Sequence, residues 1–255
     1  MASAALLLGQ VERPGMRIRG ERECKDCGAR WSYYETGGVA CPECGSLHSV
    51  GVDERTQHTN GATGLDLTEV RNAVDVDPLH RVADAAKDAC RAYVRRRGFI
   101  HGGELRTLDD EYLAAAELMH AADLIGRAMG TDDAERLYFV SLLGGADEGD
   151  RPDPEAVPDS MHEARGLAYA DAVREYHGEL RNWDGIDLDD PARSVLDRMD
   201  AHVRRIRSLQ GNVDPETVER LVTVARELHA YVTEADEDAL ARARDRLDRL
   251  AELGI

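Results

Sequence analysis

The chain has 255 residues, of which 50 are acidic and 32 are lysine or arginine, so its net charge is −18 and its pI is near 4.9. An apolar fraction of 42% is enough for a large core, and an aromatic fraction of only 5% favours packed helices over a β-sandwich. No stretch approaches the roughly 18–20 apolar residues of a membrane span, so the sequence predicts a cytoplasmic protein without a membrane partner.

The cations of this chain are almost all arginine. Only Lys25 and Lys87 are lysines, and aspartate outnumbers glutamate although glutamate forms helices more readily. This composition is typical of cytoplasmic proteins of halophilic archaea, in which molar salt shortens the Debye length to about 3 Å and a negative surface keeps the protein hydrated. An acidic mesophilic protein is the alternative. On the halophilic interpretation, the acidic surface is a background property that says little about nucleic-acid binding.

The first fifteen residues contain a short apolar run that lacks the basic segment of a signal peptide. Met16 then opens the denser part of the sequence. We therefore expect residues 1–15 to be a disordered tail, or Met16 to be the true start. Beyond Met16, the pattern of residues 16–52 predicts a small domain with short strands at 17–22, 29–35 and 47–52.

Two CxxC pairs separated by thirteen residues lie in this small domain. Their cysteines, Cys24, Cys27, Cys41 and Cys44, are the predicted ligands of a metal ion. A CxxC turn brings two thiolates within reach of one ion, and a second such turn completes a tetrahedron. A glycine follows each pair, where it tolerates a positive φ and lets backbone N–H groups turn toward the sulfurs. Four protein ligands leave no open position for water or substrate, so we predict one structural Zn²⁺; a single iron is the alternative.

With this motif, residues 16–52 resemble the zinc ribbon of transcription initiation factor B. The whole chain resembles a family of haloarchaeal proteins that are described only as containing such a ribbon. The residues carried over by the resemblance are the four cysteines and no others. The general factor has a longer loop between its CxxC pairs and is followed by cyclin-like repeats, which this sequence does not show. The resemblance therefore implies a metal-bound ribbon and does not imply a role in promoter opening.

Basic and aromatic side chains occur together in the ribbon segment. This combination suits nucleic acid, because aromatic rings stack on bases while cations contact phosphates. The candidate residues for contact with nucleic acid or with a partner protein are Arg17, Arg19, Arg22, Lys25, Arg30, Trp31, Tyr33 and Tyr34. The alternative is that the aromatic residues pack the small ribbon and that the arginines pair with neighbouring acidic residues.

The remainder of the chain predicts helices, so the predicted fold class is mainly α: a small N-terminal β zinc ribbon followed by an all-helical bundle. Residues 53–65 are polar and are predicted to be a linker. A stretch rich in aspartate and proline at 147–159 predicts a flexible connection between two helical subdomains, 66–146 and 160–255. Short links between helices predict antiparallel neighbours. After a short helix that starts near Asp66, the predicted helices cover residues 78–97, 108–129, 131–143, 160–183, 190–211, 215–232 and 238–253.

Glu117 and His120 form an ExxH pair on one of these helices. Carboxylate-bridged di-iron bundles use two such pairs, and rubrerythrin-like proteins join that bundle to a knuckle pair of similar spacing. The sequence has no second ExxH, so we expect this pair to lie on the surface or to be partly buried. Cys90, the fifth cysteine, is expected to be a small buried hydrophobic residue.

The sequence thus favours a non-enzymatic zinc-ribbon adaptor. Its ribbon is expected to contact nucleic acid or a protein of the transcription or translation apparatus, and its helical part to dock a partner or to form a dimer. Two alternatives remain open at this stage: a rubrerythrin-like redox metalloprotein, and a purely structural protein in which zinc only stabilises a small domain.

Overall fold

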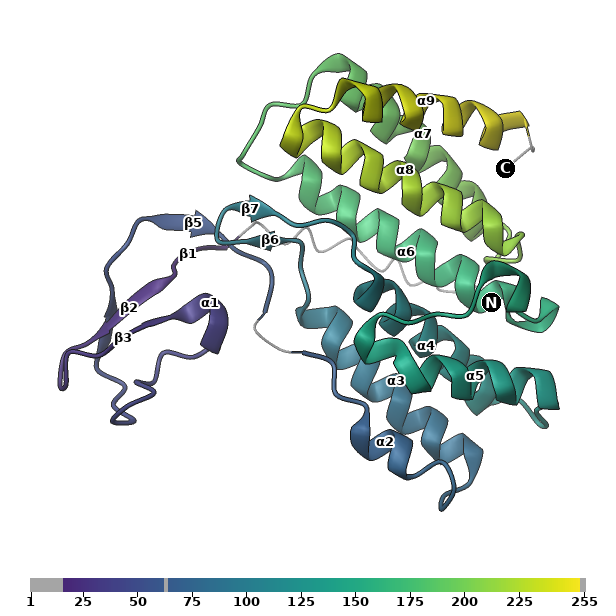
Figure 1. The fold of residues 1–255 in the computed structure, drawn as a ribbon, viewed down its shortest axis with the longest axis horizontal. Coiled ribbons are helices and arrows are strands. Elements are labelled where there is room, and N and C mark those ends of the chain that lie inside the picture. The colour runs from purple at the N-terminus through teal and green to yellow at the C-terminus, as the bar shows by residue number, and fades with distance from the viewer. Residues whose placement is uncertain (1–15, 62–63, 253–255) are drawn as a thin grey trace, which may run out of the picture.

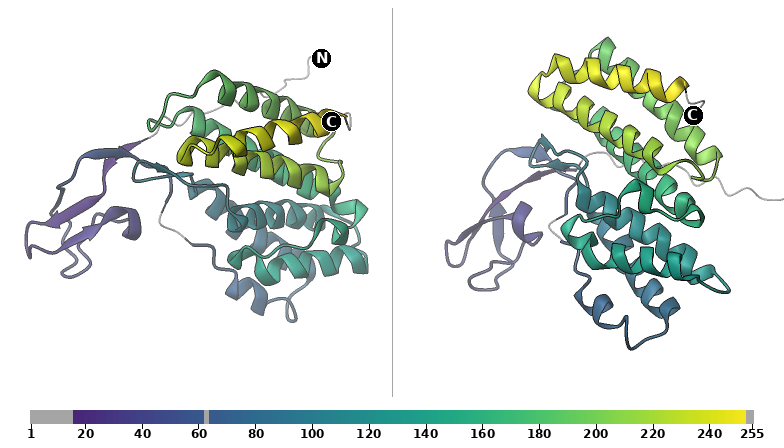
Figure 2. Two further views of the ribbon diagram at one scale, coloured as in Figure 1. Left: turned by 45° about the horizontal axis from the view of Figure 1, so that its top comes forward. Right: turned by 45° about the vertical axis from the view of Figure 1, so that its right-hand side comes forward.

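A computed structural model describes residues 16–61 and 64–252. It confirms a mainly α fold in which a small β module at the N-terminal end precedes a stack of helices. The β module projects from one side of the helical stack, and the two further views show the same arrangement (Figures 1 and 2). Residues 1–15, for which the sequence suggests a tail or a later start, lie outside the described residues.

The β module is built from a three-stranded antiparallel sheet in the order β3-β2-β4, together with a separate two-stranded pair, β1-β5. A strand was expected across residues 29–35, but β3 ends at Ser32. The chain then forms the single helical turn α1, which Gly37 ends with a φ of 62°. The strands and the turn are β1 (Arg17–Arg19), β2 (Glu21–Cys24), β3 (Arg30–Ser32), α1 (Tyr33–Thr36), β4 (Ser49–Gly51) and β5 (Arg55–Gln57).

The first part of the predicted linker, residues 53–61, does not form an unstructured connection. These residues contain β5, which pairs with β1 so that Gln57 lies opposite Arg17. The Gln57 side chain is buried, and its amide donates to the carbonyl of Asn182 at 2.8 Å. Because these polar groups find partners in the helical part, the segment is fixed against it instead of connecting two independent modules.

Helices begin where aspartates cap their first turns. The side chains of Asp109, Asp132, Asp189 and Asp214 each accept a backbone N–H at a helix start, which satisfies a donor that has no partner inside the helix. The helix predicted from residue 160 begins at His162 without a side-chain cap, because a 3₁₀ turn over Asp159–Met161 precedes it. The helices are α2 (Thr68–Asn72), α3 (Leu79–Arg96), α4 (Asp110–Arg127), α5 (Asp133–Gly145), α6 (His162–Arg181), α7 (Asp190–Ser208), α8 (Pro215–Glu234) and α9 (Glu237–Glu252).

A single hydrophobic core runs through the helical part, from Leu67 to Leu250. The two subdomains expected at 66–146 and 160–255 share this core, since α4 packs directly against α6 (Figure 1). The expected flexible connection at 147–159 is also packed: Val157 is buried, and the Arg151 side chain is engaged in ion pairs. Within the described ranges, no helix combines the length and apolar character that crossing a membrane requires.

A short hairpin of β6 (Ile100–His101) and β7 (Glu104–Leu105) connects α3 to α4 and lies beside the β module (Figure 1). It meets the end of α6, where the Trp183 indole donates to the carbonyl of Gly103 at 2.8 Å. It also meets β5, because the Gly103 N–H donates to the carbonyl of Gln57 at 2.8 Å. This hairpin is therefore the surface on which the ribbon joins the helices.

Candidate metal centre and buried charge network

The four predicted cysteine ligands come together in the β module. All of their sulfur atoms lie within 4.8 Å of one another. The Sγ–Sγ distances are 3.7 Å for Cys24 and Cys44 and 3.6 Å for Cys27 and Cys41. A disulfide needs about 2.05 Å, whereas a tetrahedral ion with metal–sulfur bonds of about 2.3 Å has sulfur–sulfur edges of about 3.8 Å. The cluster therefore fits one metal ion and does not fit a pair of disulfides.

The two CxxC turns have the same backbone hydrogen bonds. In each turn, the glycine N–H donates to the carbonyl of the first cysteine, at 3.1 Å for Gly28 with Cys24 and 2.9 Å for Gly45 with Cys41. Both glycines have a positive φ, 79° and 72°, a conformation in which a side chain would be strained. The repeated CxxCG sequence thus produces two equivalent turns, each of which presents a pair of sulfurs to the same point.

Backbone groups also prepare a sulfur for metal binding. The N–H groups of Cys27 and Asp26 lower the pKa of the Cys24 thiol from 9.0 to about 7, against the opposing effect of burial. The neighbouring sulfurs and burial instead raise the pKa of Cys27 and Cys44, since four thiolates so close together repel one another until a cation is bound. The thiolate is the form of cysteine that binds a metal. Cys24 and Cys41 are buried while Cys27 and Cys44 are exposed, so the site lies at the edge of the module and has a solvent-facing side.

The ribbon has a very small core beside this cluster. Trp31 is only 7% exposed and packs with Cys24 and Cys41, and its indole N–H donates to the carbonyl of Gly38 at 3.2 Å. This position corrects the contact role expected for Trp31, because a buried ring has no face for a nucleic-acid base. With so little apolar material, the ribbon depends on the metal for its stability.

The predicted basic contact residues are divided between two faces and have partners of their own. In the sheet register, Arg22 lies opposite Trp31, whereas Arg30 lies opposite Glu23 on the other face. Glu23 also accepts from Lys25, so one carboxylate forms ion pairs with two of the cations. The remaining partners are the Asp184 carboxylate for Arg17, the Asp53 carbonyl for Arg19 and Ser49 for Arg22. The structure therefore does not gather these residues into one basic surface.

The last two aromatic candidates, Tyr33 and Tyr34, lie on the helical turn α1, and Tyr34 belongs to the junction with the helices. Its hydroxyl lies 2.5 Å from the Thr56 hydroxyl. Its ring lies 4.5 Å from the His58 ring and 5.4 Å from the His101 ring, measured between centroids. Tyr33 is half-buried. The role of Tyr34 in the structure is thus to attach the ribbon to the β6–β7 hairpin.

Acidification is expected to weaken this junction through His58. Burial, together with the charge of His101, lowers the pKa of His58 from 6.5 to about 4. The folded state therefore keeps this imidazole neutral where the unfolded chain would protonate it. The stabilisation is complete above pH 6.5 and is lost as the pH falls toward 4. Between pH 7.5 and 5 we expect the free energy of unfolding to fall by about 2 kcal/mol from this group alone.

Denaturant unfolding at both pH values, with the wild type and two histidine variants, checks this expectation. His58→Asn removes this titrating group and should reduce the fall between the two pH values by about 2 kcal/mol; the buried and partly buried histidines that remain keep their own contributions. His80→Asn replaces an exposed histidine and should leave the wild-type slope unchanged. A slope in His58→Asn that equals that of the wild type would show that His58 does not contribute.

Glu117 of the ExxH pair is fully buried, contrary to the expectation of a surface or partly buried pair. Its carboxylate accepts from Arg165 Nε at 2.6 Å, from the Tyr169 hydroxyl at 2.8 Å and from the Tyr138 hydroxyl. These three donors come from α5 and α6, so the hydrogen bonds of this carboxylate are all made within the protein. A di-iron role for Glu117 would require breaking all three interactions.

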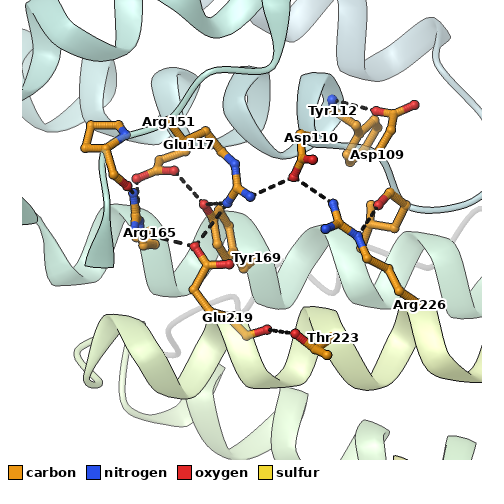
Figure 3. Close-up of polar contacts among 12 residues, drawn as sticks. Asp109, Asp110, Tyr112, Glu117, Arg151, Arg165, Tyr169, Glu219, Thr223 and Arg226 are labelled. Atoms are coloured by element: carbon orange, nitrogen blue, oxygen red, sulfur yellow. Dashed lines mark hydrogen bonds and ion pairs between the residues drawn. The ribbon is translucent and has the colours of Figure 1, made fainter. Parts of the chain in front are cut away.

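A wider network surrounds this ion pair (Figure 3). Arg151 donates to the Tyr169 hydroxyl and forms ion pairs with Glu219 at 3.1 Å and Asp110 at 2.7 Å. Asp110 also pairs with Arg226 at 2.8 Å. Burial and the Glu117 carboxylate raise the pKa of Tyr169 well above its usual range, so this hydroxyl remains a donor. The network connects α4, α6 and α8 through charges, across an otherwise apolar core.

Sequence reasoning missed this network, although a signal was present. Glu117 interrupts an almost entirely apolar run, LAAAELMHAA, and Arg165 stands among small residues on α6. A charge on the buried stripe of a helix requires an opposite charge nearby. Nothing local indicates which of the many arginines supplies it, because Glu117 and Arg165 are 48 residues apart.

Comparison of the chain with known proteins identifies one matching family model. No curated protein and no solved structure matches the chain. A family model described as a family of unknown function, DUF7117, matches residues 16–247. The match begins at Met16, where the ribbon begins, and extends through both the four cysteines and the helical core. The chain therefore belongs to the DUF7117 family, whose model covers the four-cysteine module and the helices together.

Proposed function

We propose that this protein is a non-enzymatic adaptor with one structural Zn²⁺, in which the ribbon binds a partner protein. Four thiolates saturate a tetrahedral ion, so the centre offers no position for a substrate or a reactive water. The metal then serves to hold the shape of the ribbon surface. The Glu117 carboxylate already accepts from Arg165 and Tyr169 in the core and is not free to bind iron, which favours this proposal over a rubrerythrin-like redox protein.

The observation that carries the proposal is the exposed apolar surface of the ribbon. Leu47 is 71% exposed, and Val39, Val50 and Val52 are exposed on the same small module. The ribbon, residues 16–52, has five acidic and five basic residues, so the strong negative charge of the chain lies outside it. Exposed apolar side chains on a neutral module are suited to a protein interface, in which charged residues are depleted at the centre.

The sheet register shows which residues adjoin the exposed valines. Val50 lies opposite Glu23 on the outer face, and Val52 follows two residues later on the same side of the strand. Arg30 lies next to Glu23 in the same row, so apolar and charged groups adjoin. We propose a partner in the transcription or translation apparatus, in keeping with the resemblance of the ribbon to that of initiation factor B, and a halophilic, cytoplasmic setting in keeping with the composition.

Affinity capture of the tagged full-length protein from its native lysate tests the proposal, with Val50→Glu as the interface variant. Val76→Glu is the matched control, because Val76 is an equally apolar residue exposed on the helical part. We expect a protein recovered with the wild type and with Val76→Glu to be lost with Val50→Glu. The metal content of the same samples should be close to one zinc per chain.

Three other results of this experiment would contradict the proposal, and each would indicate a different function. Recovery that disappears after nuclease treatment would indicate nucleic acid as the ligand of the ribbon in place of protein. Iron in the purified protein would contradict the zinc adaptor and favour the redox alternative. Identical recovery with all three proteins would leave the ribbon a purely structural element.

A further inference from the structure

A cavity of about 340 Å³, lined by polar and charged residues, lies between the end of α3 and the β6–β7 hairpin. This volume falls in the range of about 300–1,000 Å³ that is usual for small-molecule sites. We propose that the cavity binds the phosphate group of a nucleotide, whether the nucleotide is free or forms the end of a nucleic-acid strand. The residues that line it are Asn60, Arg97, His101, Arg106, Thr107 and Asp109.

Arg97 supplies a guanidinium that is already fixed in place. Its Nε donates to the Tyr93 hydroxyl at 3.3 Å, its Nη1 donates to the Gly98 carbonyl at 3.3 Å, and its Nη2 pairs with Asp109. Guanidinium has five N–H groups, so two remain beyond these three contacts. The Arg97 side chain is only 15% exposed, so its position changes little on binding. An orienting arginine of this kind is a usual part of a phosphate site.

Arg106 supplies the second guanidinium, from the segment that follows β7. It forms an ion pair with Glu104 at 3.4 Å, and its side chain is half-exposed. An exposed pair of this length contributes little energy, so Arg106 is able to turn toward a ligand. Two arginines from different segments can then contact separate oxygens of one phosphate.

Asp109 does not oppose an anion in this cavity, although it forms part of the wall. One of its carboxylate oxygens accepts the Tyr112 N–H at the start of α4, at 2.8 Å (Figure 3). The other oxygen pairs with Arg97. Its charge is thus balanced by an arginine and by the helix N-terminus. At the mouth, the guanidinium of Arg106 is half-exposed and is paired only weakly, through its long and exposed contact with Glu104.

Asn60 and His101 distinguish a nucleotide from a bare phosphate. The Asn60 Nδ2 lies 3.4 Å from the His101 Nδ1, while the Asn60 Oδ1 is buried and has no hydrogen-bond partner among the described residues. A buried amide oxygen of this kind requires a donor, which an amino group of a base or a sugar hydroxyl supplies. Burial, Arg106 and Arg97 lower the pKa of His101, so a bound anion would raise it again.

Fluorescence anisotropy with the zinc-loaded full-length protein tests this site. The probe is a 3′-labelled oligoribonucleotide with or without a 5′-phosphate, and AMP is the competitor. We expect the phosphorylated probe to bind at least roughly tenfold more tightly than the other. Arg106→Gln should remove this preference. Arg193→Gln should keep it, because Arg193 is an exposed arginine on α7, outside the cavity, that forms an ion pair with Asp190.

The outcomes separate the sources of the phosphate. Displacement of the probe by AMP assigns the site to free nucleotides, and tight binding that AMP does not displace assigns it to strand ends. Equal affinity for both probes overturns the proposal, and so does equal weakening by the two arginine substitutions. The site does not rest on the adaptor function, because Val50→Glu leaves the cavity intact and its capture result is independent of this one.

Discussion

Replacing Glu117 with glutamine is expected to lower the free energy of unfolding by about 3–5 kcal/mol. The substitution keeps the shape of the side chain and removes its charge, so Arg165 would remain buried without its main counter-ion. Arg165 is fully buried, and its other contacts are the Pro152 carbonyl at 2.6 Å and Glu219 at 3.6 Å. Neither contact replaces a direct ion pair. Denaturant unfolding followed by circular dichroism measures the change.

Two further variants separate the buried charge from the rest of the network. Glu219→Gln removes a carboxylate that is 27% exposed, and water can compensate for much of that loss, so we expect about 1 kcal/mol or less. The double variant Glu117→Leu/Arg165→Met replaces the buried pair with apolar groups and should recover most of the stability lost in Glu117→Gln. A cost for Glu117→Gln no greater than that for Glu219→Gln would show that the buried pair is not the critical element.

Cys24→Ser is expected to abolish metal binding and to unfold the ribbon while the helices remain folded. The ribbon core consists of Trp31, Cys24 and Cys41 with Ala29 packed against them, which is too little to fold without the metal. Binding of a structural zinc supplies about 10–16 kcal/mol in comparable small domains, so its loss exceeds any stability that the ribbon has alone. Metal analysis should give almost no zinc, and the ribbon signals should collapse in an amide NMR spectrum.

The matched control for this experiment is Cys90→Ala. Cys90 is buried in the helical core, so its removal should weaken the helices slightly and leave the metal content unchanged. Far-UV circular dichroism of Cys24→Ser should stay close to that of the wild type, since the ribbon contributes only the short turn α1 to the helix content. A collapse of the helical signal in Cys24→Ser would show that the helices require the ribbon in order to fold.

The sequence alone determined the features that depend on short spacings. Two CxxCG motifs each specify a turn, so four ligands for one metal were readable from the residues. Helix starts were predictable for the same reason, because an aspartate caps the turn that directly follows it, as at Asp189 and Asp214. The helix predicted from residue 160 begins two residues later, at His162, because residues 159–161 form a 3₁₀ turn.

Only the tertiary structure decided the features that join distant segments. Their polar composition predicted a linker at 53–65 and a flexible connection at 147–159. In the structure, the Gln57 side chain donates to the Asn182 carbonyl, and the Arg151 side chain contacts Tyr169 on α6 and Glu219 on α8. The same holds for Glu117 with Arg165 and for the cavity that brings Arg97 and Arg106 together. A polar residue is equally compatible with water and with a buried partner, and the choice depends on which groups the fold brings within about 3 Å of it.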